Sequence, residues 1–405
     1  MSLPDLKVEL FLDVSNAGGI FVLDSDSFGV LGVSTLSGVA TFDVTEYVKN
    51  VNTKRGKSRI LDYFNAGTAT VSFNNRSRIF DPLNEDSVLY PGILPRGRIQ
   101  ISVSEQPIFN GFINDWNFVF DVSDNDVAVA TCSDAFSILS NQLLDAFTPS
   151  VELTGGRINN LLNRAEVEFA GPRDIDPGRS TLGAFAVSAG TSVLNYFRQI
   201  EKSEIGNLFI GADGSLVFRD REYGIQDGQV VFSDDGTNVS YQTLNNEFGD
   251  ELLYNIVKMK SPAGAEQSKT DQGSINKYQV SQFSYQELLN SSTSEVSSIV
   301  NVFLNRYREP KLRFTRLSVQ MLGLNDNQKN RILGLDLTDY IEIRKSFAVG
   351  TPSSVDQLSV ITGVSHNISP GNHVVSFDFE DSDYLLFLTL GNDVAGRLDS
   401  NMLDF

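Results

Sequence analysis

Cysteine and histidine are scarce in this sequence, which contains one cysteine, Cys132, and two histidines, His366 and His373. A single cysteine excludes an intrachain disulfide and excludes zinc sites built from several thiolates. Catalysis of the Ser-His-Asp or Cys-His type would have to use one of the two histidines. No G-x-S-x-G elbow, P-loop, Rossmann glycine fingerprint or H-E-x-x-H motif accompanies them. We therefore expect no catalytic residue, no cofactor and no bound metal.

Basic residues are also few. The chain has 32 Lys and Arg against 51 Asp and Glu, for a formal net charge of -19. Binding to nucleic acid through phosphate neutralisation needs clustered cations, and so does attachment to an anionic membrane surface. The charge balance disfavours both classes of protein.

Long apolar runs are missing as well. The longest candidate for a membrane span, residues 180–197, contains Ser, Thr, Gly and Asn and is too polar for a bilayer helix. The start, MSLPDLKVEL, has no basic segment followed by an apolar one, so no secretory signal is expected. At 405 residues, with 41% apolar residues, the chain is long enough for two to four domains that each bury a core. We expect a soluble, acidic, multidomain protein of a reducing compartment.

What is present is mostly β. Residues 69–73, 98–103 and 127–132 alternate apolar and polar side chains, which is typical of half-buried strands. Asp213-Gly214 lies between LFIG and SLVF and predicts a hairpin with a type I′ turn. The segment 261–277 is polar and contains Gly and Ser, so we expect an exposed loop there.

Four helices are predicted from caps and apolar spacing. The first follows Asp134 and runs to about Phe147. Two more follow Thr154 and Thr191. The fourth has an apolar stripe over residues 296–307, with Ser294 as a possible cap and Pro310 as the stop.

These elements divide the chain into three parts. The two middle helices and the hairpin fall in residues 148–228, which predicts a small α/β domain. Its flanks, 1–147 and 229–405, are rich in strands, and the second carries the helix near 294–308. The predicted fold class is mainly β (α+β), with two β domains flanking a small α/β domain.

The two flanks resemble each other. Residues 99–103, 108–114 and 126–134 form a triplet of strands, and so do residues 341–345, 360–366 and 373–381. Gly111 and Gly363 take matching places in the middle strands, and Asp134 and Asp381 end the triplets. A glycine in mid-strand indicates a bulge or a barrel bend. We interpret the match as an internal duplication, although any two β segments with a glycine share part of it.

Other patterns give weaker hypotheses. His366 and His373 could meet across a hairpin, but packing between strands is the more common role. Asp121, Asp124 and Asp126 lack the glycine and final glutamate of an EF-hand loop, so a solvated turn is favoured over calcium. No local pair of carboxylates points to glycoside hydrolysis. Trp116 is expected in a core.

One basic island interrupts the acidic background: Lys54, Arg55, Lys57 and Arg59. The simple interpretation is a solvated strand edge. The alternative is a contact with an acidic neighbouring chain or with another copy of this chain.

The order of motifs in the first half carries a resemblance. DVTEYVKNVNTKRGKSR at 43–59 is followed by FNAGTATVSFNNRSRIFDPLN at 64–84, YPGILPRGRIQISV at 90–103 and IFNGFINDW at 108–116. GRINNLLNRAE, RDIDPGRSTL and LFIGADGSLVFRDR follow in the middle, and GRLDSNMLDF stands at the end. This series resembles the tail hub proteins of long-tailed bacteriophages, also called baseplate hub or minor tail proteins.

The resemblance implies a fold and a role. Such hubs have two related tube-type β-barrel domains per chain, so a homotrimer supplies six barrels and caps a hexameric tail tube. The implied partners are the distal tail protein or tail tube protein, the tape measure protein, and fibre or spike proteins. Phage DNA would pass through without specific binding. The implied location is the distal end of the tail in the virion, after assembly in the bacterial cytoplasm.

Two alternatives remain open, a distal tail ring component and a tail-tip hydrolase acting on the host envelope. Many relatives carry a long carboxy-terminal fibre, lysin or peptidase extension, whereas this sequence stops at Phe405, so we expect no enzyme. For a channel that passes DNA, we also expect lumen-facing strand positions to be acidic or neutral. The basic island would then face a neighbouring subunit.

Overall fold

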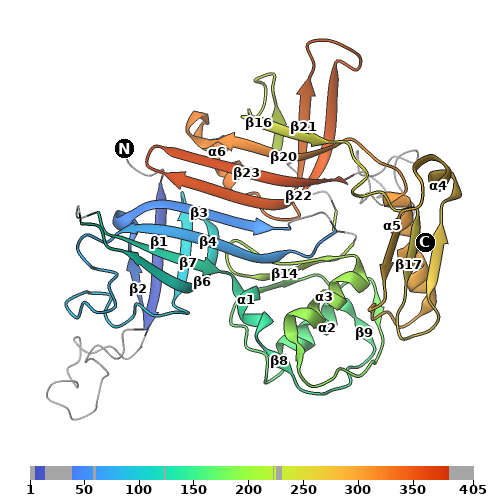
Figure 1. Ribbon diagram of the computed structural model, residues 1–405, viewed down its shortest axis with the longest axis horizontal. Helices are drawn as coiled ribbons and strands as arrows, with labels where there is room; N and C mark the ends of the chain where they lie inside the picture. Colours follow the sequence, from blue (N-terminus) through green and yellow to red (C-terminus); the bar gives the residue numbers. More distant parts are fainter. Residues whose placement is uncertain are drawn as a thin grey trace.

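A single large sheet dominates the molecule (Figure 1). The structure is a computed structural model that describes residues 5–13, 39–57, 61–122, 125–221, 223–224 and 230–382. Eleven strands of the 13-stranded sheet follow the path β16-β20-β23-β22-β3-β4-β7-β6-β5-β1-β2, and β15 and β21 branch from it beside β22. The expectation of a mainly β fold is confirmed.

The first β unit supplies one half of this sheet. Its elements are β1 (Leu6–Asp13), β2 (Val39–Asp43), η1 (Thr45–Tyr47), β3 (Val48–Gly56), β4 (Asn65–Asn74), β5 (Arg98–Val103), β6 (Gln106–Val119) and β7 (Val127–Ser133). Apolar side chains at every second position form one buried face, as in β1, where Leu6, Val8, Leu10 and Leu12 are all buried. Period-2 burial of this kind fixes the strand register, because a slip of one residue would expose the whole apolar set.

The second β unit supplies the other half. Its elements are β15 (Val230–Ser233), β16 (Thr243–Glu247), β20 (Arg313–Gln320), η2 (Met321–Gly323), α6 (Asp326–Leu333), β21 (Tyr340–Ser346), β22 (Ser354–Ser369) and β23 (Asn372–Asp381). β3 pairs with residues 363–368 of β22, and this seam joins the two units edge to edge. They therefore share one sheet, because β21 covers only the first part of β22 and leaves the rest free for β3.

The middle unit contains short strands and two packed helices. Its elements are α1 (Ala135–Ser140), β8 (Leu143–Leu144), β9 (Glu152–Leu153), α2 (Thr154–Leu162), β10 (Arg173–Ile175), β11 (Thr181–Leu182), β12 (Thr191–Ser192), α3 (Val193–Glu204), β13 (Asn207–Ile210) and β14 (Leu216–Arg219). Asp134 caps α1 as predicted, but α1 ends at Ser140 because the chain turns at Asn141 into β8, which pairs with β12. β8 thus pairs with a strand of the predicted middle domain, and the boundary at 148 stays a prediction.

A further α/β unit projects from the second half. It comprises β17 (Ile256–Met259), β18 (Gln267–Thr270), α4 (Gln272–Tyr278), β19 (Gln282–Tyr285) and α5 (Thr293–Tyr307), and its apolar side chains form a core cluster of their own. The prediction of a loop over 261–277 was wrong, since β18 and most of α4 lie there. The predicted fourth helix is α5, and Ser292 rather than Ser294 caps it.

The predicted hairpin is present as β13 and β14, but its turn is different. Gly211 and Ser215 are joined by a hydrogen bond from the Gly211 amide, and the Gly214 amide bonds back to Gly211. Only Gly214 in this loop has a positive φ, +88°, whereas a type I′ turn needs two such residues. The connection is a three-residue loop closed by glycine.

The two β units share the same registers in detail. Residues 112–119 of β6 and 360–367 of β22 correspond one to one, and each strand bulges at the third of these positions, Asn114 and Thr362. The residue before each bulge makes two backbone hydrogen bonds with a dipeptide outside the strand. Ile113 bonds to residues 96–97 and Ile361 to residues 338–339, and the first residue of each dipeptide has a positive φ. Those residues are Arg96, at +68°, and Thr338, at +72°.

This register corrects the predicted glycine match. Gly363 corresponds to Asp115, and Gly111 lies on the β5 side of the bulge, opposite Ile99. Both glycines are nevertheless tight positions. A Cβ on Gly111 would lie 2.4 Å from the Ser133 carbonyl oxygen, and one on Gly363 would lie 2.8 Å from Asp378 Oδ2. Asp134 and Asp381 do occupy matching places, one residue after Ser133 and Glu380.

No helix among the described residues is long and apolar enough to cross a membrane.

Candidate functional site

One face of the large sheet is a continuous polar surface, which we call the polar face. Directly paired residues of antiparallel strands point to the same side of a sheet. Lys54 pairs with Thr68 on one side and with Ser365 on the other, and these pairings extend the same face from β16 to β6. The outward residues are Thr243 and Asn245; Arg316, Ser318 and Gln320; Val374, Ser376 and Asp378; Ser365 and Asn367; Asn50, Asn52 and Lys54; Thr68, Thr70, Ser72 and Asn74; Val127, Val129 and Thr131; Asp115, Asn117 and Val119.

The polar face is nearly neutral, in contrast to a chain of net charge -19. Most of its side chains are Ser, Thr, Asn or Gln, and its charged residues are two of each sign. Arg316 and Asp378 form an ion pair of 3.5 Å, while Lys54 and Asp115 form no ion pair with another described residue. The acidic excess therefore lies elsewhere on the molecule.

Short hydrogen bonds connect neighbouring strands across this face. Ser318 Oγ and Ser376 Oγ are 2.9 Å apart, and Gln320 donates to Asn372 Oδ1 at 2.7 Å. Such contacts keep the side chains close to the sheet. The result is a surface that offers hydroxyl and amide groups without a cluster of cations.

Arg55 holds the seam from the opposite face. Its guanidinium lies 2.7 Å from Asp336 Oδ1 and donates to the Ile210 carbonyl at 3.4 Å, and its side chain is only 4% exposed. Asp336 also accepts from the Ala212 amide at 3.1 Å. One ion pair, with a buried arginine and a partly exposed aspartate, therefore connects the first β unit, the second β unit and the middle hairpin.

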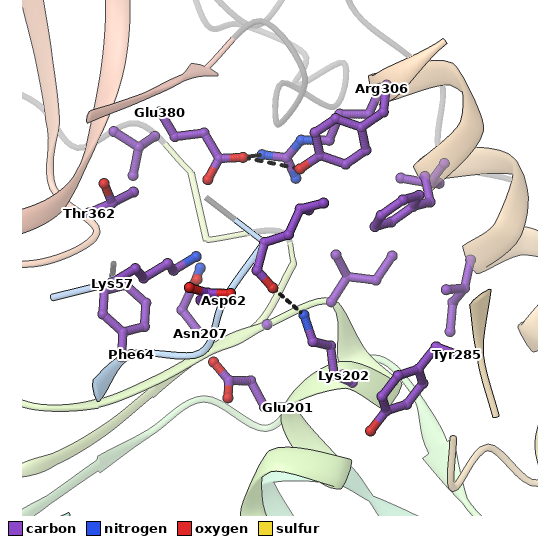
Figure 2. Close-up of a pocket in the computed structure, with 18 of the residues that line it drawn as sticks. Lys57, Asp62, Phe64, Glu201, Lys202, Asn207, Tyr285, Arg306, Thr362 and Glu380 are labelled. Carbon is purple, nitrogen blue, oxygen red and sulfur yellow. Dashed lines mark hydrogen bonds and ion pairs between the residues drawn. The ribbon is translucent and has the colours of Figure 1, made fainter. Parts of the chain in front are cut away.

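A small cavity lies where the four units meet (Figure 2). Lys57 reaches it from the end of β3, Lys202 from α3, Arg306 from α5 and Glu380 from β23. Lys202 donates to the Leu61 carbonyl at 2.9 Å, and Arg306 is paired with Glu380, as the dashed lines in Figure 2 show. The opposite wall is apolar, with Met259, Phe283, Leu288, Ile299 and Phe303 from the projecting unit.

Burial controls the charges around this cavity. Desolvation lowers the pKa of Lys57 and of Lys202, and it raises the pKa of Glu201; each shift is opposed by neighbouring opposite charges. The ammonium of Lys57 also lies 4.7 Å from the centre of the Phe64 ring. These groups are largely buried and compensate one another, which is the pattern of a structural junction.

The size of the cavity limits its chemistry. As lined by the described residues, its volume is about 90 Å³, room for a few water molecules. Sites for small-molecule substrates are several times larger, at roughly 300–1,000 Å³. A sugar or peptide substrate does not fit here.

The two histidines meet across the β22–β23 hairpin. His366 Nδ1 lies 3.1 Å from His373 Nε2, and both side chains are buried. Burial is the main cause that lowers the pKa of His366 well below its usual value, helped by His373 and Arg55, and burial lowers the pKa of His373 to about 4. Two neutral imidazoles sharing one hydrogen bond fit this arrangement. Among the described residues, no three His, Cys, Asp or Glu side chains gather as metal ligands.

The basic island is divided by the structure. Lys54 points outward from the polar face, Arg55 is buried in the seam, Lys57 turns into the cavity, and Arg59 lies outside the described residues. The expectation of a contact with a neighbouring subunit is corrected for Arg55, because a side chain 4% exposed has no surface to offer. For Lys54 it stays a prediction.

The remaining candidates are placed as follows. Trp116 is partly buried against the core and stacks on Phe118. Cys132 is buried, which raises the pKa of its thiol to about 12. The amide of Asp121 donates to Asp126 Oδ1 at 2.7 Å within a turn, and Asp124 lies outside the described residues.

Sequence reasoning did not identify the polar face or the junction cavity. Alternation in single strands marked some of the outward positions, such as Thr68, Thr70 and Ser72. Their continuity across β16 to β6 depends on the pairing of β3 with β22, and no local pattern signals that pairing.

Comparison with known proteins identifies the fold. No protein-family model matches this chain, and no curated protein matches it in sequence. Among solved structures, the fold is similar to the 43 kDa tail protein of prophage MuSo2 from Shewanella oneidensis, with a TM-score of 0.57 and 11% identity over 85% of this chain and 97% of that one.

Two other tail proteins give similar values. The tail protein from Neisseria meningitidis MC58 has a TM-score of 0.57 and 10% identity, and the match covers 94% of this chain and 98% of that one. Prophage tail protein gp18 from Listeria monocytogenes EGD-e has a TM-score of 0.51 and 11% identity over 93% and 95% of the two chains. The chain has the fold of phage tail proteins.

Proposed function

We propose that this protein is a structural hub of a phage tail tip or baseplate, and that its polar face lines the channel through which DNA leaves. The observation that carries this proposal is the polar face itself, a neutral surface spanning both repeats of a strongly acidic chain. The shared fold with prophage tail proteins supports the setting.

The chemistry of the face suits transit rather than binding. Each phosphate neutralised by a Lys or Arg adds affinity that depends on salt. A wall with two cations, one of them paired with Asp378, offers little such affinity, and its hydroxyl and amide groups keep it wetted. DNA would pass along it without being held.

The repeat supports a threefold assembly. Each chain presents two β units with the same registers, so three chains present six equivalent units around one axis. Closed cyclic symmetry is the usual arrangement of a homo-oligomer. A homotrimer would match a sixfold tail tube or distal tail ring above and would carry fibres or a spike below. The tape measure protein would end in its lumen, at the distal end of the virion tail, after assembly in the host cytoplasm.

The role is proposed as non-enzymatic. Among the described residues, the two histidines are buried and bond to each other, and Cys132 is buried as well, so these three side chains form no exposed nucleophile–base pair.

The test uses lysine substitutions on the polar face. Asn52→Lys, Thr70→Lys and Ser365→Lys together place three cations beside Lys54. Assembled tails with these changes should eject DNA more slowly at low salt, and salt should restore the rate. A matched control puts three lysines at exposed Gln272, Asn276 and Gln286 of the projecting unit.

Two results would count against the proposal. One is unchanged ejection by tails that have assembled with the polar-face lysines. The other is a reconstruction of the tail in which the polar face points away from the lumen or the copy number is not three.

A further inference from the structure

We infer that the outer edge of β16 in one copy pairs, antiparallel, with the free half of β6 in the next copy, and so repeats between chains the seam that β3 and β22 form within a chain. The inference rests on the proposed assembly and names the surface that each copy uses. The partner it requires is a second copy of this chain.

Two free edges lie at equivalent places of the repeat. β22 pairs with β21 along its first part and with β3 along residues 363–368. β6 pairs with β5 along its first part, but residues 114–119 have no strand on that side among the described residues. β16 likewise has β20 on one side and no described strand on the other. The second half of β6 therefore lacks the neighbour that β3 provides for β22. β16 occupies the same position in the second β unit that β3 occupies in the first.

The register of the joint follows from the seam. Val51 of β3 pairs with Val71, and Leu244 of β16 pairs with Leu317 at the matching place of the second unit. Asn52 therefore corresponds to Asn245, and Asn367 corresponds to Val119. Since Asn52 lies opposite Asn367 in the seam, the same pairing between chains sets Asn245 opposite Val119 of the next copy. It also sets Phe248 opposite Trp116 and Gly249 opposite Asp115.

Exposure supports this pairing. Positions that are buried in the seam, such as Val51, Val364 and Ile368, correspond to Leu244, Trp116 and Phe120 at the free edges. Phe120 is 64% exposed and Phe248 is 70% exposed. Trp116, Phe118 and Phe120 form a stacked row along one side of the β6 edge. The joint would cover this row, and an uncovered edge of this kind invites pairing.

A glycine adds an independent sign. Gly56 ends the seam strand, where a Cβ would lie 2.4 Å from the Gly363 Cα. Gly249 takes the equivalent place after β16, and within one chain a Cβ there would meet nothing within 4 Å. Glycine at 249 is thus unexplained by the single chain and is explained if another strand approaches it as β22 approaches Gly56.

Disulfide trapping tests the register. Directly opposed residues have Cα atoms about 4.5–5.5 Å apart, which a disulfide can span. Asn245→Cys with Val119→Cys should cross-link between chains and close into covalent trimers. Asn52→Cys with Asn367→Cys is the matched positive control within one chain. Asn245→Cys with Asp115→Cys is the matched negative control, because those positions would be four residues out of register.

A second variant tests the contact without cysteines. Phe248→Asp should raise the concentration needed for assembly by about tenfold or more, since one apolar anchor becomes a charge beside an aromatic row. Val280→Asp, at an exposed apolar residue of the projecting unit, should leave assembly unchanged.

The outcomes separate the joint from the hub. Trimers seen by electron microscopy without cross-linking of Asn245→Cys/Val119→Cys would overturn the joint and leave the hub proposal standing. Cross-linking into open ladders or rings of other sizes would support the joint and overturn the trimeric hub. Cross-linking of the out-of-register pair, or a chain that stays monomeric at every concentration, would overturn the joint.

Discussion

Removing Asp336 should weaken the molecule more than removing its partner, Arg55. In Asp336→Ala, the guanidinium of Arg55 stays 4% exposed but loses the carboxylate 2.7 Å away. The Ala212 and Leu337 amides lose their acceptor as well. Breaking a buried ion pair by deleting one partner costs about 3–5 kcal/mol.

We expect the lower end of that range, about 3 kcal/mol. The side chain of Asp336 is 31% exposed, so water can replace part of what is lost. Asp134 lies near Arg55 too; burial raises the pKa of Asp134 to about 7, and Arg55 opposes that rise. Without Asp336, ionised Asp134 would compensate part of the charge.

Arg55→Met should cost less, about 1 kcal/mol. It leaves the partly exposed carboxylate of Asp336 with its two backbone donors, and methionine fills most of the buried volume. The assay is urea unfolding followed by the fluorescence of Trp116, the single tryptophan of the chain, which lies in β6.

The control is Asp326→Ala, which removes an exposed carboxylate that is paired with Lys329 and should leave the urea midpoint unchanged. The reasoning fails if Arg55→Met is as destabilising as Asp336→Ala, or if Asp336→Ala costs less than about 1 kcal/mol. Either result would mean that the pair does not hold the seam.

Three further predictions concern other parts of the molecule. The pKa of His373 is about 4 in the fold and about 6.5 when unfolded, so the unfolded state takes up a proton first as pH falls. The stability that neutral His373 contributes is therefore fully present above pH 6.5 and is lost as pH falls toward 4. His373→Gln should make the unfolding free energy, measured across this pH range, about 3 kcal/mol less sensitive to acid. Gly155→Ala should destabilise the fold by about 3 kcal/mol, because its Cβ would lie 1.9 Å from the Asp176 carbonyl oxygen. Gly156→Ala should stabilise it by about 0.5–1 kcal/mol, because its Cβ would make only an ordinary contact with Glu152 Oε2 at 3.8 Å; a thermal melt in which both variants change alike would contradict this. Phe303→Ala should cost about 3–5 kcal/mol, and hydrogen exchange should show the loss in the projecting unit alone, since its core cluster is separate from the main one.

The sequence was informative where local patterns decide the structure. Asp134 caps α1, and the apolar stripe at 296–307 lies within α5. The order of strands in the two triplets also follows from alternation alone. β18 and α4 were missed because their residues are polar and exposed and bury little of their own surface.

The candidate site depended on contacts that no local pattern reveals. Lys54 and Arg55 are neighbours on opposite faces of β3, so alternation sends one inward and one outward. Which one is buried depends on Asp336, far along the chain, and on the middle hairpin that packs over the seam. Glycines were a poor guide to register, since the equivalent bulges fall at Asn114 and Thr362 instead.

The seam also imposes a delay during synthesis. β3 is made early, but its partner residues in β22 emerge roughly three hundred residues later, about 15–60 s at bacterial translation rates of about 5–20 residues per second. During that interval the β3 edge is unpaired, and the charged side chains of Lys49 and Lys54 disfavour its pairing with a strand of another chain. On a crowded polysome, the first competitor for that edge is the β22 strand of another nascent chain. Pairing with that strand would give a domain-swapped dimer. Pairing within one chain must therefore be faster than pairing between neighbouring nascent chains.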